Sequence, residues 1–351
     1  MTKYLLRKLI NSFFVLLGVV SLVFIIFQVM PGDTVSMMVG QRSDPSTKKA
    51  IVQEYGLDKS LGTQFLHYIN DLSPVSFHED TKKNEEKYAY AKVLSFRKVA
   101  MVLKKPYLRR SFQDNRLVSE IIVESFIRTF WLALSAMIFA SIIGISLGVL
   151  AALKQNSFLD RFLVTSSILG ISIPSFVAGV LIAFLFAIKW HHITHLNLFG
   201  YLIEIDPFTG KHLELKNLIL PAITLGIRPL AIIVQLTRGA MLDVMKEDYI
   251  RTAKAKGLSA TKVLLRHALR NAMNPVVTVI SGWFASLLAG AFFVEIIFSW
   301  GGLGSVTIQA VFSKNFPVIM GATIVVATLF VIINILVDLL YAWLDPRIRL
   351  K

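Results

Sequence analysis

Long hydrophobic runs separated by shorter polar segments dominate the pattern of this chain. A helix needs about 20 residues to cross the hydrocarbon core of a bilayer, and each run reaches that length. The runs lack the short alternating segments of a membrane barrel, so the pattern predicts helices. Five runs carry no charge (9–30, 129–153, 162–188, 271–294 and 315–337), and a sixth, 217–242, is interrupted by Arg228 and Arg238. We therefore expect an all-α polytopic membrane protein with six transmembrane helices.

The first run is interpreted as a retained span. It follows Lys3, Arg7 and Lys8, as the core of a signal peptide does, but it is 22 residues long and is followed by Pro31-Gly32 instead of a cleavage site.

Lysine and arginine flank the runs unevenly, which predicts their orientation, because short cytoplasmic segments are enriched in these residues. Cations cluster before the first run, in 241–271, which has seven, and in the tail 346–351. We therefore expect a multi-pass membrane protein with both termini in the cytoplasm. The predicted parts are a tip and first span (1–30), an extracytoplasmic loop (31–118), a core of five spans (119–345) and the tail.

The large loop between the first two spans has two kinds of pattern. Residues 44–72 have helical spacing of apolar positions. Residues 79–105 begin charged and become amphipathic; we interpret them as a solvated charged insertion, with a small helical subdomain or an interfacial helix as the alternative. We expect a helical loop with an insertion around 74–105.

The cationic segment 243–272 is predicted to form a helical hairpin on the cytoplasmic surface. Residues 248–256 fit a short helix, and Gly257 stands where a helix end favours a left-handed residue. Ser259 is placed to cap a second helix, with Lys262 at the third helical position. Such a hairpin would by default serve as a membrane-surface anchor.

This hairpin resembles the coupling segment of binding-protein-dependent ABC importer permeases, a Glu-Ala-Ala-x-x-x-Gly motif. The chain reads "RTAKAKG" at 251–257, with Arg251 in the acidic position, a form similar to the peptide/nickel branch. Other stretches resemble that branch in the correct order: "LVTSSILGISIPSFVAGVLI", "ILPAITLGI", "GAFFVEIIFSWGGLGSV" and "NILVDLLYAWLDPRIR".

The resemblance implies the permease subunit of an importer for di- or oligopeptides in the bacterial inner membrane. It implies a second homologous permease, in a heterodimer, two ATPase subunits that bind ATP and magnesium, and an extracytoplasmic binding protein; the chain itself would hold no cofactor. Residues for contact with the ATPase would be Tyr249, Ile250, Ala253, Ala255, Gly257 and Leu258. Nickel or another small solute remains an alternative cargo.

A few residues in or near the spans are candidates for the transport pathway or its gate. Ionisable groups in a span are costly and usually face a cavity, which singles out Arg228, Glu295 and Asp338. A structural ion pair is the alternative for Arg228, and hydration or hydrogen bonding at a helix end is the alternative for Glu295 and Asp338. Glycines 301, 302 and 304 of "SWGGLGS" form a candidate gate hinge.

The sequence argues against other functions. It has no phosphate-binding loop, so we expect no ATP hydrolysis and no enzyme activity in this chain. The "HHITH" stretch (191–195) is interpreted as interfacial packing, not as a metal site. A secondary transporter independent of ATPases is the less favoured alternative, because no inverted repeat is evident. The net charge is +15, but most of the Lys and Arg residues flank the predicted spans or lie in the long loop, so the charge does not indicate nucleic-acid binding.

Overall fold

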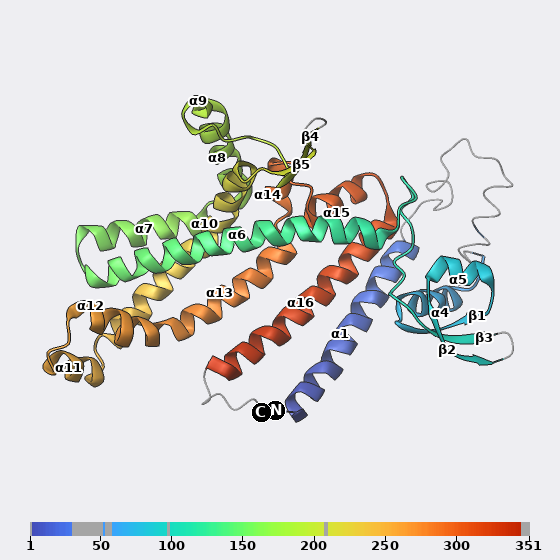
Figure 1. Cartoon of the computed structure of the whole chain (residues 1–351), viewed down its shortest axis with the longest axis horizontal. Helices are drawn as coiled ribbons and strands as arrows, with labels where there is room; N and C mark the ends of the chain where they lie inside the picture. The colour runs from blue at the N-terminus through green and yellow to red at the C-terminus, as the bar shows by residue number, and fades with distance from the viewer. Residues whose placement is uncertain (1, 30–51, 53–57, 97–98, 207–209, 345–351) are drawn as a thin grey trace. The chain divides into compact units, whose positions relative to one another are not determined.

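The structure, a computed structural model, describes residues 2–29, 52, 58–96, 99–206 and 210–344 (Figure 1). The chain forms two compact units. Unit 1 comprises Met1–Leu5, Ser125–Val306 and Leu329–Lys351, and unit 2 comprises Leu6–Glu124 and Thr307–Thr328. The fold is mostly helical, as predicted.

The helices of unit 1 follow the predicted order of spans. They are α6 (Val118–Leu153, which begins in unit 2), α7 (Phe158–Ser172), α8 (Ser175–Ile182), η1 (a π-helix, Ala183–Lys189), α9 (His191–Thr194), α10 (Lys216–Val244), α11 (Asp248–Ala255), α12 (Ala260–Lys262), η2 (a π-helix, Val263–Leu269), α13 (Arg270–Gly290), α14 (Phe292–Ile297) and the end of α16 (Phe316–Leu344). A hairpin of β4 (Ile203–Asp206) and β5 (Gly210–Leu213) precedes α10.

Four described helices are long and apolar enough to cross a membrane: α1 (Thr2–Val29), α6, α10 and α16. The predicted third span is instead a pair of helices, Phe158–Ser172 and Ser175–Lys189, bent by 106°. Pro174 explains the break, because the residue before a proline avoids the helical conformation, and Ile173 has φ −74° and ψ 125°. Counting the pair as one span gives five. The α13 helix has spanning length at 21 residues but is more polar, so a count of six stays a prediction.

Close packing of α6 against α10 forms the centre of unit 1. Small residues recur every fourth position of α6, at Ala136, Ala140, Gly144, Gly148 and Ala152. A Cβ on Gly148 would lie 2.6 Å from the Cβ of Thr237, so only glycine permits this approach. Small residues at helix contacts are typical of membrane proteins, because the association depends on van der Waals packing.

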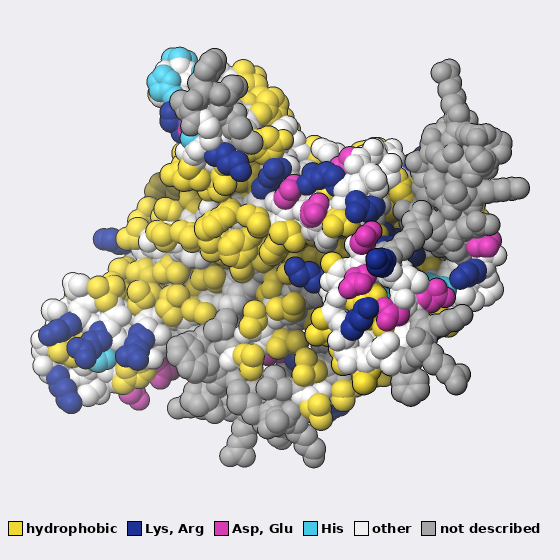
Figure 2. All heavy atoms as spheres, turned by 45° about the vertical axis from the view of Figure 1, so that its right-hand side comes forward, with side chains coloured by type: hydrophobic (Ala, Val, Ile, Leu, Met, Phe, Trp, Pro, Cys, Tyr) yellow, Lys and Arg dark blue, Asp and Glu magenta, His cyan; other side chains and the backbone are white. Residues whose placement is uncertain are grey.

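The outward surface of these helices is apolar. Exposed large hydrophobic side chains include Ile138 and Ile142 on α6 and Phe162 and Leu169 on α7. Figure 2 shows the hydrophobic side chains as a broad band with few charges in it. Such a surface matches the hydrocarbon interior of a bilayer and would be unfavourable in water.

In unit 2, the prediction of a helical loop was wrong for the insertion. Helix α4 (Leu61–Leu72) lies within the predicted helical stretch, most of whose first half, 44–57, lies outside the described residues. It is followed by β1 (Val75–Glu79), α5 (Lys82–Tyr88), β2 (Ala91–Phe96) and β3 (Val99–Leu103). These strands form an antiparallel sheet in the order β1-β3-β2. Burial alternates along β1 and β3, with Ser76, His78, Ala100 and Val102 inside, which is the two-residue period of a strand.

Asp71, at the end of α4, holds the sheet and α5 together. Its carboxylate accepts a hydrogen bond from Tyr88 Oη at 2.9 Å, and its backbone carbonyl accepts one from Lys104 Nζ. The imidazole of His78 stacks on the ring of Tyr88, with centroids 4.1 Å apart. This polar core fixes a small α/β subdomain between the first two spans. Unit 2 also contains α15 (Leu303–Phe312) in part, and the first half of α16.

Candidate functional site

The predicted coupling hairpin is present between α10 and α13. Gly257 follows α11 with φ +77°, the left-handed conformation predicted for it. Ser259 caps the next helix, because its Oγ accepts a hydrogen bond from the Lys262 backbone N–H at 3.4 Å. The second helix continues as η2 without interruption into α13. The turn and the cap are therefore confirmed at the residues that predicted them.

Two of the predicted contact residues have a different role. Ile250 is 0% exposed and Ala253 is 6% exposed, and both pack in a cluster with Met241 of α10 and with Val263 and Ala268 of η2. Their side chains are buried by this internal packing and are not accessible for contact with a partner. They anchor the hairpin to the end of α10, so a force on the hairpin acts on that helix.

The other predicted contact residues lie at the surface. Tyr249 is 40% exposed, and its hydroxyl accepts a hydrogen bond from Asn271 Nδ2 at 2.9 Å; Ala255 and Gly257 are exposed, and Leu258 is half-buried. Leu265, on η2, was missed although its side chain is 56% exposed. Figure 2 shows dark blue side chains gathered over this hairpin at the lower left. The exposed cations are Lys246, Arg251, Lys254, Lys256, Lys262, Arg266 and Arg270.

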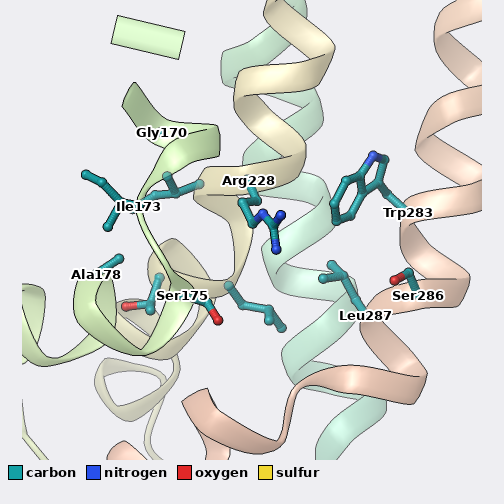
Figure 3. A pocket seen from close by; sticks show the side chains of 11 residues that line it. Gly170, Ile173, Ser175, Ala178, Arg228, Trp283, Ser286 and Leu287 are labelled. Carbon is teal, nitrogen blue, oxygen red and sulfur yellow. The ribbon is translucent and has the colours of Figure 1, made fainter. Parts of the chain in front are cut away.

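A cavity of about 130 Å³ lies between α7, α8, α10 and α13, and Arg228 is part of its wall (Figure 3). Arg228 is exposed and projects from α10 into the space between Ile173 and Trp283. The other lining residues are Gly170, Ser175, Ala178, Thr224, Leu225, Ile227, Ser286 and Leu287. The sequence-based placement of Arg228 beside a cavity therefore agrees with the geometry, whereas Ser175, Trp283 and Ser286 were missed.

A polar stripe on α13 extends this cavity. Asn274, Thr278, Gly282 and Ser286 recur at intervals of four residues and so lie on one helix face. A second cavity of about 350 Å³ is lined by Thr278, Val279, Gly282, Trp283 and Ser286, and so shares Trp283 and Ser286 with the first. The four-residue spacing was the available sequence signal for this groove.

Glu295 does not lie in this groove. It is 0% exposed, its Oε1 accepts a hydrogen bond from Thr129 Oγ1 at 2.5 Å, and its Oε2 accepts one from the Ser305 N–H at 2.9 Å. Ser305 lies in the first turn of α15, whose unpaired N–H groups and dipole favour a carboxylate. Glu295 therefore ties α14 to the start of α15, and its role in the pathway or gate stays a prediction.

The glycine-rich turn 299–305 is firmly held. A Cβ on Gly302 would collide with the Glu295 carboxylate, one on Gly304 would lie 2.6 Å from Phe292 Cβ, and one on Gly301 would lie 2.7 Å from an Arg128 nitrogen. The Trp300 indole N–H donates to the Arg128 carbonyl at 2.8 Å. These contacts describe a packed turn, so its role as a gate hinge stays a prediction.

The remaining candidates are dispersed. Asp338 is half-buried in α16, away from the residues that line either cavity. His191, His192 and His195 are exposed, and His191 Nδ1 lies 3.0 Å from the Leu196 carbonyl. The described part of the chain contains no group of three or more His, Asp or Glu side chains placed to hold a metal ion.

Arg238 and Asp160 form a buried ion pair that the sequence did not predict. Arg238 Nε lies 2.5 Å from Asp160 Oδ1, and its NH2 lies 2.7 Å from Oδ2, so the contact is bidentate. The side chains are 26% and 3% exposed. Arg238, the second cation in the predicted span 217–242, thus joins α10 to the start of α7, and Asp160 neutralises its charge.

Comparison with known proteins places these features in a family. Residues 144–350 match the model of the binding-protein-dependent transport system inner membrane component, and residues 1–133 match the model of its N-terminal part. The chain is 37% identical to the dipeptide transport system permease protein of Escherichia coli K12, over 100% of both chains. It is 36% identical to the di/tripeptide transport system permease protein of Pseudomonas aeruginosa, over 98% of this chain and 97% of that one.

A further relative and a solved structure agree with this result. The glutathione transport system permease protein of Salmonella typhimurium is 34% identical over 100% of both chains. An inward-facing structure of the MetNI methionine ABC transporter has the same fold, with a TM-score of 0.53 and 17% identity, over 65% of this chain and 97% of that one.

The two family models together match nearly the whole length, and the first one alone matches more than half. The chain thus belongs to the binding-protein-dependent transport inner membrane component family: it is a multi-pass inner-membrane permease subunit of an ABC importer, which works with a binding protein and leaves ATP hydrolysis to separate subunits.

Proposed function

We propose that this permease carries short peptides into the cytoplasm. The support is the cargo named for the relatives, which are permeases for dipeptides, di- and tripeptides and glutathione. The groove beside Arg228 joins two cavities of about 130 and 350 Å³ that share Trp283 and Ser286, which gives a short peptide space along α13. Nickel remains the second candidate, but the groove-lining residues include no His, Asp or Glu to serve as ligands for it.

The permease works in a heterodimer with a second homologous permease, and each of the two receives one ATPase subunit at its cytoplasmic hairpin. Both termini of this chain and the hairpin lie in the cytoplasm. ATP and magnesium are bound by the ATPase subunits, and this chain needs no cofactor of its own. The extracytoplasmic binding protein delivers the cargo.

The observation that carries this mechanism is the anchoring of the coupling hairpin. Its exposed face carries Tyr249, Ala255 and several cations, while Ile250 and Ala253 bind it to α10. An ATPase that moves the exposed face therefore moves α10 with it, and α10 carries Arg228 into the groove. The cycle of ATPase closure and opening thereby changes the access to the groove.

Substitutions of Gly257 test the coupling. A Cβ at Gly257 would meet no atom within 4 Å, so the penalty of Gly257→Val is conformational: the left-handed backbone costs about 1–2 kcal/mol. Gly257→Asn is the matched control, because asparagine tolerates this conformation, as Asn156 does here at φ +63°.

We expect Gly257→Val to insert and assemble but to lose peptide uptake and the stimulation of ATP hydrolysis by the loaded binding protein. Gly257→Asn retains the turn, so it should retain most of both activities. The assay is uptake and hydrolysis measured together in proteoliposomes that contain the complete importer. Normal coupled uptake by Gly257→Val would mean that the hairpin is only a surface anchor.

Cargo is tested separately in cells with and without this permease, supplied with labelled dipeptide, a longer peptide or nickel. Uptake of a peptide that depends on the permease supports the proposal. Uptake of nickel alone would contradict it.

A further inference from the structure

Arg228 is the charged residue in the wall of the groove, and its surroundings do not neutralise it. The residues that line its cavity include no carboxylate. Across the described chain, no hydrogen bond or ion pair to its guanidinium is present, whereas Arg238 on the same helix is paired with Asp160. The guanidinium of Arg228, which has five N–H donors, therefore has no acceptor from the described chain.

A cation in this position needs water or an anion. The helix α10 is a membrane-spanning candidate, and a charge near the middle of a span is energetically costly unless it faces a polar cavity. The cavity provides some polarity through Ser175, Thr224 and Ser286. These hydroxyls are neutral and do not balance a full positive charge.

The backbone next to Arg228 adds a further polar group. Residue 229 is proline and has no N–H, so it cannot donate the usual helical hydrogen bond to the carbonyl of Leu225, which also lines the cavity. The cavity thus combines a fork of cationic donors with hydroxyl groups, next to a helix that lacks one backbone hydrogen bond. Trp283 supplies an apolar wall beside them (Figure 3).

We propose that Arg228 binds the free α-carboxylate of the peptide cargo as the cargo passes through the groove. This rests on the proposed function, and it names the chemical group that the groove recognises. Guanidinium and carboxylate form two parallel charge-assisted hydrogen bonds, which a neutral C-terminal amide cannot reproduce. The cavity of about 130 Å³ beside Arg228 has room for the carboxylate end of the cargo.

The test compares one dipeptide with a free C-terminus and the same dipeptide as its C-terminal amide. Uptake of each is measured in proteoliposomes with the complete importer, at a concentration that saturates the binding protein with either peptide. The binding protein also discriminates between them, but it is identical in every sample. Its contribution therefore cancels when the acid-to-amide ratio of a variant is divided by that of the wild type.

We expect Arg228→Gln to lower this ratio about tenfold or more, because a hydrogen-bonded charge pair is replaced by a neutral contact. Arg228→Lys keeps the charge but loses the fork, so the ratio should fall at least about threefold. Lys189→Gln removes an exposed charge at the end of η1, outside the cavity, and should leave the ratio unchanged.

An unchanged ratio in both Arg228 variants would overturn the proposal. So would failure of both variants to assemble with the second permease, because Arg228 would then be a structural partner of that subunit. Failure of the wild-type importer to carry either peptide is a different result: it would contradict peptide transport itself, and the carboxylate contact with it.

Discussion

Replacing Arg238 by methionine should destabilise unit 1 strongly, because the partner that remains cannot reach water. The side chain of Asp160 is 3% exposed, and its carboxylate would keep only the Asn156 N–H, at 2.9 Å. Removing one member of a buried ion pair typically costs about 3–5 kcal/mol. The loss has an upper bound, because the orphaned acid can take up a proton; for an ordinary aspartic acid at pH 7 this costs about 4 kcal/mol. We therefore expect a loss of about 3–4 kcal/mol for Arg238→Met.

The two halves of this pair should not be equivalent. Asp160→Asn leaves Arg238 unpaired, but that side chain is 26% exposed and can turn its charged end toward water. Asparagine also retains an oxygen for the Asn156 N–H. We expect about half the loss seen for Arg238→Met, and the double variant Asp160→Asn/Arg238→Met should be more stable than Arg238→Met alone.

The assay is the fraction of the detergent-solubilised importer that remains monodisperse on size exclusion after heating. Since 1 kcal/mol corresponds to about 2–4 °C for a domain of 150–250 residues, Arg238→Met should lower the midpoint by about 6–16 °C. Equal midpoints for the two single variants would refute the argument from burial. A double variant no more stable than Arg238→Met would refute the argument from the orphaned charge.

Two further predictions concern pH and topology. Burial, followed by the nearby positive charge of Lys104, lowers the pKa of His78 below its usual 6.5. The folded state thus favours the neutral ring, so this stabilisation is full above about pH 6.5 and is lost as the pH falls from there through the lowered pKa. After correction for the intrinsic exchange rate at each pH, the amides of residues 61–105 in the full importer should be less protected at pH 5 than at pH 7.5, and His78→Phe should flatten that difference. For topology, single cysteines at the exposed positions Ser95 and Ser259 of this cysteine-free chain should react from outside only at 95. Labelling of position 259 in intact cells would contradict a cytoplasmic hairpin.

The parts of this fold that follow from short-range chemistry could be predicted from the sequence. The left-handed turn at Gly257 and the cap at Ser259 depend on single residues whose conformational preferences are strong. The long helices follow from uninterrupted apolar length. Arg228 was identified because a charge within a span requires an explanation, and the cavity beside it supplies one.

The sequence-based predictions failed where the conformation or burial of a residue depends on residues that are distant in the sequence. In strand β1 the buried positions are the polar residues Ser76 and His78, and in β3 exposed Val99 and Leu103 are as apolar as buried Ala100 and Val102, so hydrophobicity gave no strand signal. Glu295 lies close to the end of a predicted span, and only the folded chain brings Thr129 and Ser305 to its two oxygens. Ile250 and Ala253 were assigned to a partner, although the end of α10 buries them first.

One helix, α10, connects the features on which function depends. Arg228 in the groove, Arg238 in the ion pair with α7 and Met241 under the coupling hairpin follow one another along it. At 1.5 Å per residue, Arg228 lies about 20 Å along α10 from Met241. A tilt of α10 about its hairpin end would therefore displace Arg228 in proportion to this distance. The bidentate contact to Asp160 makes α7, which contributes Gly170 to the cavity, follow the same movement. Under the proposed mechanism, the α7 and α10 walls of the groove would move together with the hairpin, whereas the α13 wall is joined to the hairpin directly through η2. Weakening the Arg238–Asp160 pair should for this reason impair coupling as well as stability.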